Sequence, residues 1–158
     1  MVLVALCGCA KKAPFHARYE TLIREANNPT EKQTYTFEYR LLCYMEKDEL
    51  EQHIAITDAV DQFKAWMLAK AYLDENISVC SGISLPRKDR NRWRIRCWVG
   101  REGKEIPPVY VDAHTGSITC EGNLTVDNPS DFLTQYYARF KRHNQSPEPK
   151  PPRNKGDL

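Results

Sequence analysis

Residues 57–76 read Thr57-Asp-Ala-Val-Asp-Gln-Phe-Lys-Ala-Trp-Met-Leu-Ala-Lys-Ala-Tyr-Leu-Asp-Glu-Asn76. Apolar side chains recur there at the spacing of one helix face, because Val60, Phe63, Met67 and Ala71 lie three or four residues apart. The pair Thr57-Asp58 is typical of a helix N-cap, and acidic residues favour the positive end of the helix dipole. We therefore predict a core-facing helix over about residues 57–76.

The segment after this helix predicts an antiparallel meander over about residues 77–120. Its best strand, residues 92–99, alternates between two faces, with Trp93, Ile95, Cys97 and Val99 on one and Arg94, Arg96 and Trp98 on the other. Residues 77–85, 109–112 and 117–120 also have strand composition, and a charged loop at 87–91 and glycine-containing turns separate the strands. In the last turn we expect Asp112 to accept backbone hydrogen bonds and Gly116 to be left-handed.

A second helix is predicted over about residues 128–143. Asn128 suits the N-cap, and Pro129 suits the first helical position. One face of this helix is aromatic, so we expect that face to pack against the rest of the fold. We therefore predict an α+β fold, with an antiparallel three- to four-stranded sheet packed by helices at about 57–76 and 128–143.

The region between the N-terminus and residue 56 is less regular. Residues 15–26 have helical spacing, and residues 47–56 suggest a helix or helical turn. Residues 33–45 fit both patterns: their β-rich composition favours a strand, but Phe37, Leu41 and Tyr44 also fit a helix. We favour the strand and leave the helix open.

The first residues, Met1-Val-Leu-Val-Ala-Leu-Cys-Gly-Cys9, resemble the lipobox of bacterial lipoproteins. The resemblance implies that Cys9 carries a lipid anchor, and Ala10 after it implies sorting to the outer membrane, facing the periplasm. The apolar run is shorter than a signal peptide requires, so we expect that its upstream part is missing. The alternative is a buried strand over residues 2–6 of a cytosolic protein.

Four cysteines would remain in a mature lipoprotein. Outside the cytoplasm they are disulfide candidates, and four cysteines allow three pairings. The alternative is free thiols buried in strands. Their spacing, with scattered histidines, does not indicate a metal site, and we expect no cofactor. These cysteines are Cys43, Cys80, Cys97 and Cys120.

Residues 59–121 resemble the PepSY domain pattern through Trp93-Arg-Ile-Arg-Cys-Trp98 and Val109-Tyr-Val-Asp-Ala-His-Thr-Gly116. They are also similar to small bacterial immunity proteins with NTF2-like folds. The resemblance implies a non-enzymatic extracytoplasmic module that inhibits a peptidase or regulates a partner. In an NTF2-like cone, Trp66, Trp93 and Trp98 would line a ligand pocket, although aromatic residues more often pack in cores.

The chain is accordingly divided into four parts. Residues 1–8 are a signal-peptide remnant, and 9–56 form a tether and an N-terminal helical or strand region. Residues 57–145 form the PepSY-like domain with its C-terminal helix. Residues 146–158 form a proline-rich tail that we expect to be disordered.

The sequence offers no convincing catalytic motif, and a Cys43–His53 nucleophile and base pair would lack a motif context. The net charge of +2 argues against a nucleic-acid partner. Two charged clusters are candidate protein-binding surfaces: Glu46, Asp48 and Glu49, and Arg94, Arg96 and Trp98. We therefore expect a non-enzymatic lipoprotein that binds and inhibits or regulates a secreted toxin or peptidase. The alternative is a structural subunit of an envelope secretion or conjugation assembly, which the tail would help to dock.

Overall fold

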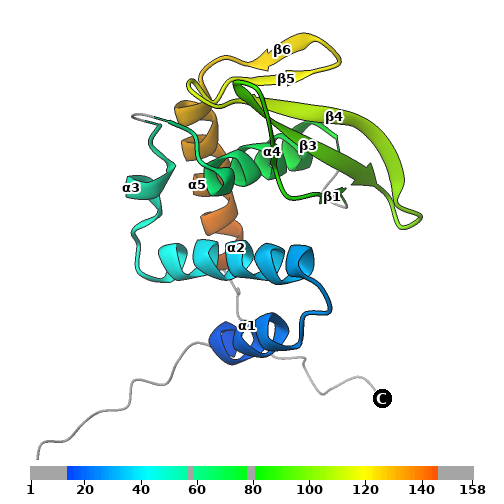
Figure 1. Cartoon of the computed structure of the whole chain (residues 1–158). Helices are drawn as coiled ribbons and strands as arrows, with labels where there is room; N and C mark the ends of the chain where they lie inside the picture. The colour runs from blue at the N-terminus through cyan, green and yellow to red at the C-terminus, as the bar shows by residue number, and fades with distance from the viewer. Residues whose placement is uncertain (1–13, 57–58, 78–80, 146–158) are drawn as a thin grey trace, which may run out of the picture.

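The computed structural model describes residues 14–56, 59–77 and 81–145 as five helices and an open antiparallel sheet of six strands. The elements are arranged in layers (Figure 1). The sheet covers one side of the central helix α4 (Gln62–Asn76). The helices α2 (Pro29–Glu46) and α5 (Pro129–Gln145) lie on the other sides of α4, and α1 (Pro14–Glu25) lies outside α2. The predicted α+β class is confirmed, with more strands than the expected three or four.

The helix α4 (Gln62–Asn76) is the centre of the core, and it begins later than predicted. Its N-cap is Asp61, whose Oδ1 accepts a hydrogen bond from the Lys64 backbone N–H at 2.7 Å. Residues 57–58, where the sequence suggested a cap, lie outside the described residues. Side chains are buried on every side of α4, as in a helix enclosed by its neighbours. They are Phe63, Ala65, Trp66, Met67, Leu68, Ala69, Ala71, Tyr72 and Leu73.

The sheet has two strand segments along one edge. Both β1 (Ser81–Ile83) and β2 (Arg87–Asp89) pair antiparallel with β3 (Arg92–Val99). Between them Ser84 continues the contact, because its backbone N–H donates to the Arg96 carbonyl at 2.9 Å and its Oγ accepts from the Arg96 N–H at 3.0 Å. Buried Pro86 follows, and its carbonyl accepts from Gln62 Nε2 of α4.

The remaining strands continue the meander. They are β4 (Lys104–Asp112), β5 (Ile118–Cys120) and β6 (Asn123–Val126), so the sheet order is β1/β2-β3-β4-β5-β6. The strand predicted over 92–99 is confirmed. The loop expected at 87–91 contains β2, and β6 was not predicted.

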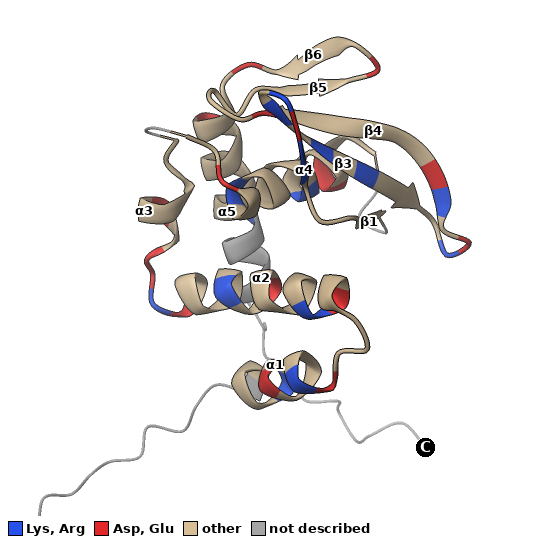
Figure 2. Cartoon of the chain, viewed as in Figure 1, with Lys and Arg blue, Asp and Glu red and all other residues tan. Residues whose placement is uncertain are grey.

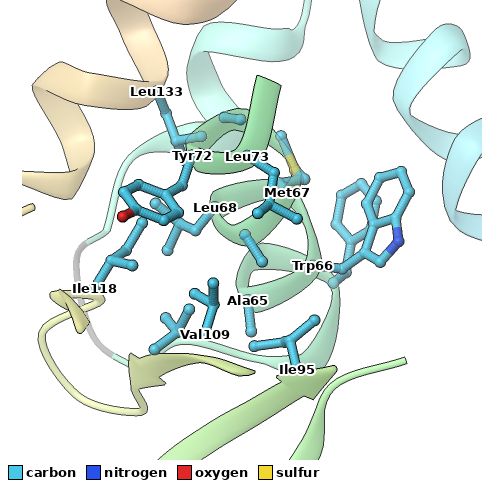
Figure 3. Packing of buried hydrophobic residues seen from close by; sticks show 14 of the residues in the cluster. Ala65, Trp66, Met67, Leu68, Tyr72, Leu73, Ile95, Val109, Ile118 and Leu133 are labelled. Carbon is cyan, nitrogen blue, oxygen red and sulfur yellow. The ribbon is translucent and has the colours of Figure 1, made fainter. Parts of the chain in front are cut away.

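Within the described residues, helices pack against only one face of the sheet. Ile95 and Cys97 of β3 are fully buried with Val109, Val111 and Ile118 of the neighbouring strands. Figure 3 shows Ile95, Val109 and Ile118 of this group on the side of α4 that carries Ala65 and Leu68, whereas Trp66 points toward a different side of the helix. The predicted alternation of β3 therefore places its arginines on the face that no helix covers.

The helix α5 (Pro129–Gln145) confirms the helix predicted at 128–143. The Asn128 Oδ1 accepts from the Asp131 backbone N–H at 3.3 Å, as expected of an N-cap. Leu133 and Tyr137 are buried in the core, and the Tyr136 hydroxyl donates to Asp74 of α4 at 2.6 Å. This contact fastens α5 to the central helix.

The strand favoured at residues 33–45 is wrong, because they belong to the helix α2 (Pro29–Glu46). Asn28 caps this helix through a 2.9 Å bond from the Glu31 backbone N–H, and Pro29 is preorganised for its first turn. The Phe37 ring packs 5.8 Å from that of Trp66. Burial against α4 therefore outweighs the β-rich composition.

The other two helices flank α2. The helix α1 (Pro14–Glu25), predicted at 15–26, packs along α2, where His16 Nδ1 lies 2.8 Å from the Tyr39 hydroxyl and its Nε2 lies 2.8 Å from Glu46. Burial and the adjacent Glu38 carboxylate raise the pKa of Tyr19, on the same interface, to about 12. The short helix α3 (Leu50–Ile54) follows α2, within the predicted 47–56.

Candidate functional site

The outer face of the sheet gathers basic side chains along β3. Figure 2 shows Lys and Arg along β3, and the helices of the described residues lie to one side of the sheet. Because alternate residues of a strand share a face, Arg94, Arg96 and Trp98 project together, as predicted, with Arg92 in the same row. Arg92, Arg94 and Arg96 are exposed, and Trp98 is half-buried.

At one end of this row, the positive charge of Arg96 is balanced by the carboxylate of Glu105. Arg96 Nε and Nη2 donate to the two carboxylate oxygens of Glu105 on β4 at 2.8 and 2.9 Å, a bidentate geometry. The hydrogen bonds from Arg96 hold the pKa of Glu105 below its usual value, and the carboxylate raises the pKa of Arg96. The Arg96 guanidinium also lies 5.3 Å from the Trp98 ring centroid, within cation–π range.

The other end is compensated in the same way. The Arg92 guanidinium lies 3.8 Å from the Tyr110 ring centroid, and it donates from Nε to Asp89 of β2 at 3.2 Å. The planar cation therefore has both an aromatic surface and a carboxylate.

The middle of the row lacks a carboxylate. Arg94 is directly opposite Arg87 on β2 and opposite Tyr110 on β4. Both arginines are exposed, and within the described residues neither makes a recorded ion pair. Like charges directly opposite each other in a sheet are unfavourable. These two guanidinium groups therefore lack an ion-pair partner within the described residues, although the Arg94 charge also helps to lower the pKa of Glu105.

A hollow of about 450 Å³ opens over these side chains. An open, charged concavity of this kind suits the anionic groups of a larger partner better than a small apolar ligand, which requires an enclosed pocket. We call it the arginine hollow. Its lining residues are Ser84, Arg87, Lys88, Asp89, Arg94, Arg96 and Tyr110.

The acidic candidate residues Glu46, Asp48 and Glu49 lie at the end of α2 and the turn after it. Glu46 is engaged by His16, and Glu49 occupies the N-cap position of α3. Asp48 has a left-handed backbone, with φ of 57°, and borders a cavity of about 50 Å³ between α3 and α5. These three acidic residues therefore form part of the junction between α2 and α3.

The three tryptophans do not share a pocket. Trp66 is buried between α4 and α2, and Trp98 lies on the outer face. The Trp93 indole donates to the Val60 carbonyl at 2.7 Å, beneath the cation of Lys88. The pocket suggested by an NTF2-like cone therefore does not form from these residues.

The described cysteines Cys43, Cys97 and Cys120 are free thiols, and Cys9 and Cys80 lie outside the described residues. Burial raises the pKa of Cys97 to about 11. Because β4 separates β3 from β5, the backbones at Cys97 and Cys120 are at least about 10 Å apart, too far for a disulfide without backbone movement. The His53 ring stacks on Tyr44 at 3.7 Å, and no recorded contact within the described residues joins it to Cys43.

In residues 14–56, 59–77 and 81–145, no group of three or more His, Cys, Asp and Glu side chains is arranged to hold a metal ion. No helix in these ranges is both long and apolar enough to cross a bilayer.

Comparisons with protein-family models, with curated proteins and with solved structures returned no match. The sequence identified Arg94, Arg96 and Trp98 but missed Arg87 and Tyr110. The charged run at 87–91 was visible, but its pairing with β3 was not.

Proposed function

We propose that this chain is a non-enzymatic lipoprotein that binds a secreted protein partner, such as a toxin or a peptidase, and inhibits or regulates it. The observation that carries the proposal is the helix-free outer face of the sheet, where Arg94, Arg96 and Trp98 project together beside Tyr110. Arginine, tryptophan and tyrosine are the residues that most often dominate the energy of protein interfaces. A PepSY-like or immunity-protein-like role agrees with such a binding face.

The proposal includes a lipid anchor at Cys9 that would hold the chain at the outer membrane, facing the periplasm. Its basis is the lipobox-like sequence Leu6-Cys-Gly-Cys9. Mass spectrometry of the N-terminus of the membrane-extracted protein tests this part. A diacylated or triacylated Cys9 supports the anchor, and an unmodified Met1 overturns it.

Partner capture with matched variants tests the binding face. Wild-type protein, Trp98→Ala and Arg18→Ala are used to capture proteins from the native envelope and culture medium, and each candidate is then purified and mixed with the same three proteins. Arg18 is the control because it is exposed on α1, away from the sheet.

We expect one stoichiometric secreted partner whose binding weakens at least about tenfold in Trp98→Ala, as for an interface hot spot, and is unchanged in Arg18→Ala. Equal binding by all three proteins would overturn the assignment to the outer face. Recovery of several envelope-machine subunits, lost when residues 146–158 are deleted, would instead favour a structural role.

A further inference from the structure

We propose that the arginine hollow binds carboxylate side chains of an acidic segment of the protein partner, with Arg87 and Arg94 as the receiving pair. This inference rests on the proposed function and specifies the chemistry of the partner. It depends on a contrast within the row Arg92, Arg94 and Arg96, whose two end members each bind a carboxylate while the middle one does not.

The neighbouring arginines show which group is missing. Arg96 holds Glu105 through two hydrogen bonds, and Arg92 holds Asp89. Each therefore has a carboxylate supplied by the adjacent strand. Arg94 has the Arg87 cation on one side and the Tyr110 ring on the other, so the same arrangement lacks its anion in the middle of the row.

Electrostatic repulsion between Arg87 and Arg94 is unfavourable for the stability of the fold. Two cations directly opposite each other in adjacent strands destabilise the sheet. A local conflict of this kind, placed in a concave and exposed region, is where a functional site is expected. A carboxylate from a partner would relieve the repulsion and make charge-assisted hydrogen bonds with the two guanidinium groups.

Charge balance favours a carboxylate over a nucleic acid. The outer face of the sheet carries Arg87, Arg92, Arg94 and Arg96. Three carboxylates offset most of this charge: Asp89, Glu105, and Asp112, which lies directly opposite Arg92. A phosphate backbone crossing the sheet would meet these carboxylates. Nucleic-acid sites usually show a strong basic excess, whereas the chain has a net charge of only +2. One carboxylate at the Arg87–Arg94 pair matches the charge that remains.

The test uses defined probes and the full chain. A ten-residue peptide of alternating glutamate and serine is titrated into isotope-labelled protein, and the arginine Nε–Hε signals are followed by NMR. The same peptide with glutamine in place of glutamate, inorganic phosphate and oligothymidylate are titrated for comparison. We expect the signals of Arg87 and Arg94 to shift with the glutamate peptide, and binding of the glutamine peptide to be at least about tenfold weaker.

A charge reversal separates binding from folding. Arg94→Glu replaces the repulsion by an attraction to Arg87, so the variant should keep its fold and melt at the wild-type temperature or up to about 4 °C higher. It should nevertheless lose at least about tenfold in affinity for the glutamate peptide. Arg18→Glu, with the same charge change on α1, should bind the peptide as the wild type does.

The inference is overturned if the glutamate and glutamine peptides bind equally, if no signal shifts, or if Arg94→Glu binds the peptide normally. Tighter binding of oligothymidylate or phosphate would overturn it in favour of a phosphate-binding face. If the captured partner requires Trp98 but tolerates Arg94→Glu, the proposed function stands and this inference fails.

Discussion

Gly116 shows how one residue joins the sheet to the helices. Its φ is +76°, in the left-handed region that the sequence predicted for this turn. A Cβ atom at this position would lie 2.7 Å from Cδ1 of Ile56 and 3.1 Å from Cγ of Pro129. The turn after β4 therefore packs against both the α3–α4 connection and the start of α5, and it requires glycine for conformation and for space.

Gly116→Ala should therefore be more destabilising than the same change at another left-handed glycine. Gly122 is the matched control, because its φ is +80° but a Cβ there would meet nothing within 4 Å. We expect Gly122→Ala to lose about 1–2 kcal/mol from backbone strain, and Gly116→Ala to lose a further ~1–3 kcal/mol from overpacking. Urea unfolding measures both losses; equal losses would contradict the close packing around Gly116.

Asp112 stabilises the same turn in a way that depends on pH. Its Oδ1 accepts from the backbone N–H groups of His114 and Thr115 at 2.9 and 2.7 Å, as predicted from the sequence. These hydrogen bonds hold the pKa of the Asp112 carboxyl below its usual value, and the bond from the Thr115 N–H has the largest effect. The stabilisation is therefore complete above the unfolded pKa of about 3.9 and is lost as the pH falls through the lower folded pKa.

Asp112→Ala should cost about 1 kcal/mol at neutral pH, as for a lost capping side chain, and less in acid. Unfolding free energies of wild type and variant, measured from pH 7 to pH 2, should converge below pH 3.9. A difference that stays constant to pH 2 would show that the charge of Asp112 contributes nothing.

At the scale of secondary-structure elements, the sequence predicts the helices and strands whose patterns depend on adjacent residues. The alternation of β3 and the Asn128-Pro129 start of α5 were both readable, because each depends on adjacent residues. The helix α2 was not, since Tyr35, Phe37 and Tyr39 are strand formers. In the folded chain Thr34 and Thr36 donate their hydroxyls to the carbonyls four residues earlier, at 3.0 and 2.8 Å, and Phe37 faces α4.

The candidate site was predictable only in part for the same reason. Arg94, Arg96 and Trp98 share a face through the period of one strand. The opposition of Arg87 and Arg94 depends on the register between β2 and β3, which Pro86 and the Ser84 contact set. The stacking of Arg92 on Tyr110 depends on a third strand. Such pairings between elements are not visible in a single sequence.

The contact of α5 with α4 should depend on the Tyr136–Asp74 hydrogen bond. The Tyr136 side chain is 8% exposed, and its hydroxyl lies 2.6 Å from a carboxylate that also meets Lys70 at 3.5 Å. Tyr136→Phe should lose about 1.5–3 kcal/mol of stability, the range for a bond to a charged group.

A double-mutant cycle with Asp74→Asn checks the assignment of this loss. Unfolding free energies of the two single variants and the double variant should give a coupling of at least about 0.5 kcal/mol, since the two side chains are in contact. Additive losses would instead show that the Tyr136 hydroxyl does not act through Asp74.

At the scale of the whole molecule, charge and packing are distributed differently. Residues 14–56 carry five Lys and Arg against eight Asp and Glu, whereas residues 81–112 carry eight against four. The region of α1 to α3 is therefore negative and the strands β1 to β4 are positive, which would steer an acidic partner toward the sheet. The core is not divided in this way, because α4 is shared by the sheet, α2 and α5.

A substitution in α4 should therefore weaken the molecule as one unit. Leu68→Ala is expected to cost about 2–5 kcal/mol, because Leu68 is fully buried in the shared core. Leu124→Ala, the same change at a residue that is 61% exposed on β6, should cost less than about 0.5 kcal/mol. Urea unfolding followed by fluorescence and by circular dichroism should give one coincident transition; two separate transitions would contradict a single core.

The interrupted edge of the sheet has a consequence for solubility. An open sheet with long, regular edges recruits other strands and polymerises, so soluble proteins shorten, break or charge their edges. Here Pro86 divides one edge into two segments of three residues, and β6 at the other edge has four. The molecule can therefore keep one face of its sheet uncovered without offering its edges as a template for amyloid-like growth.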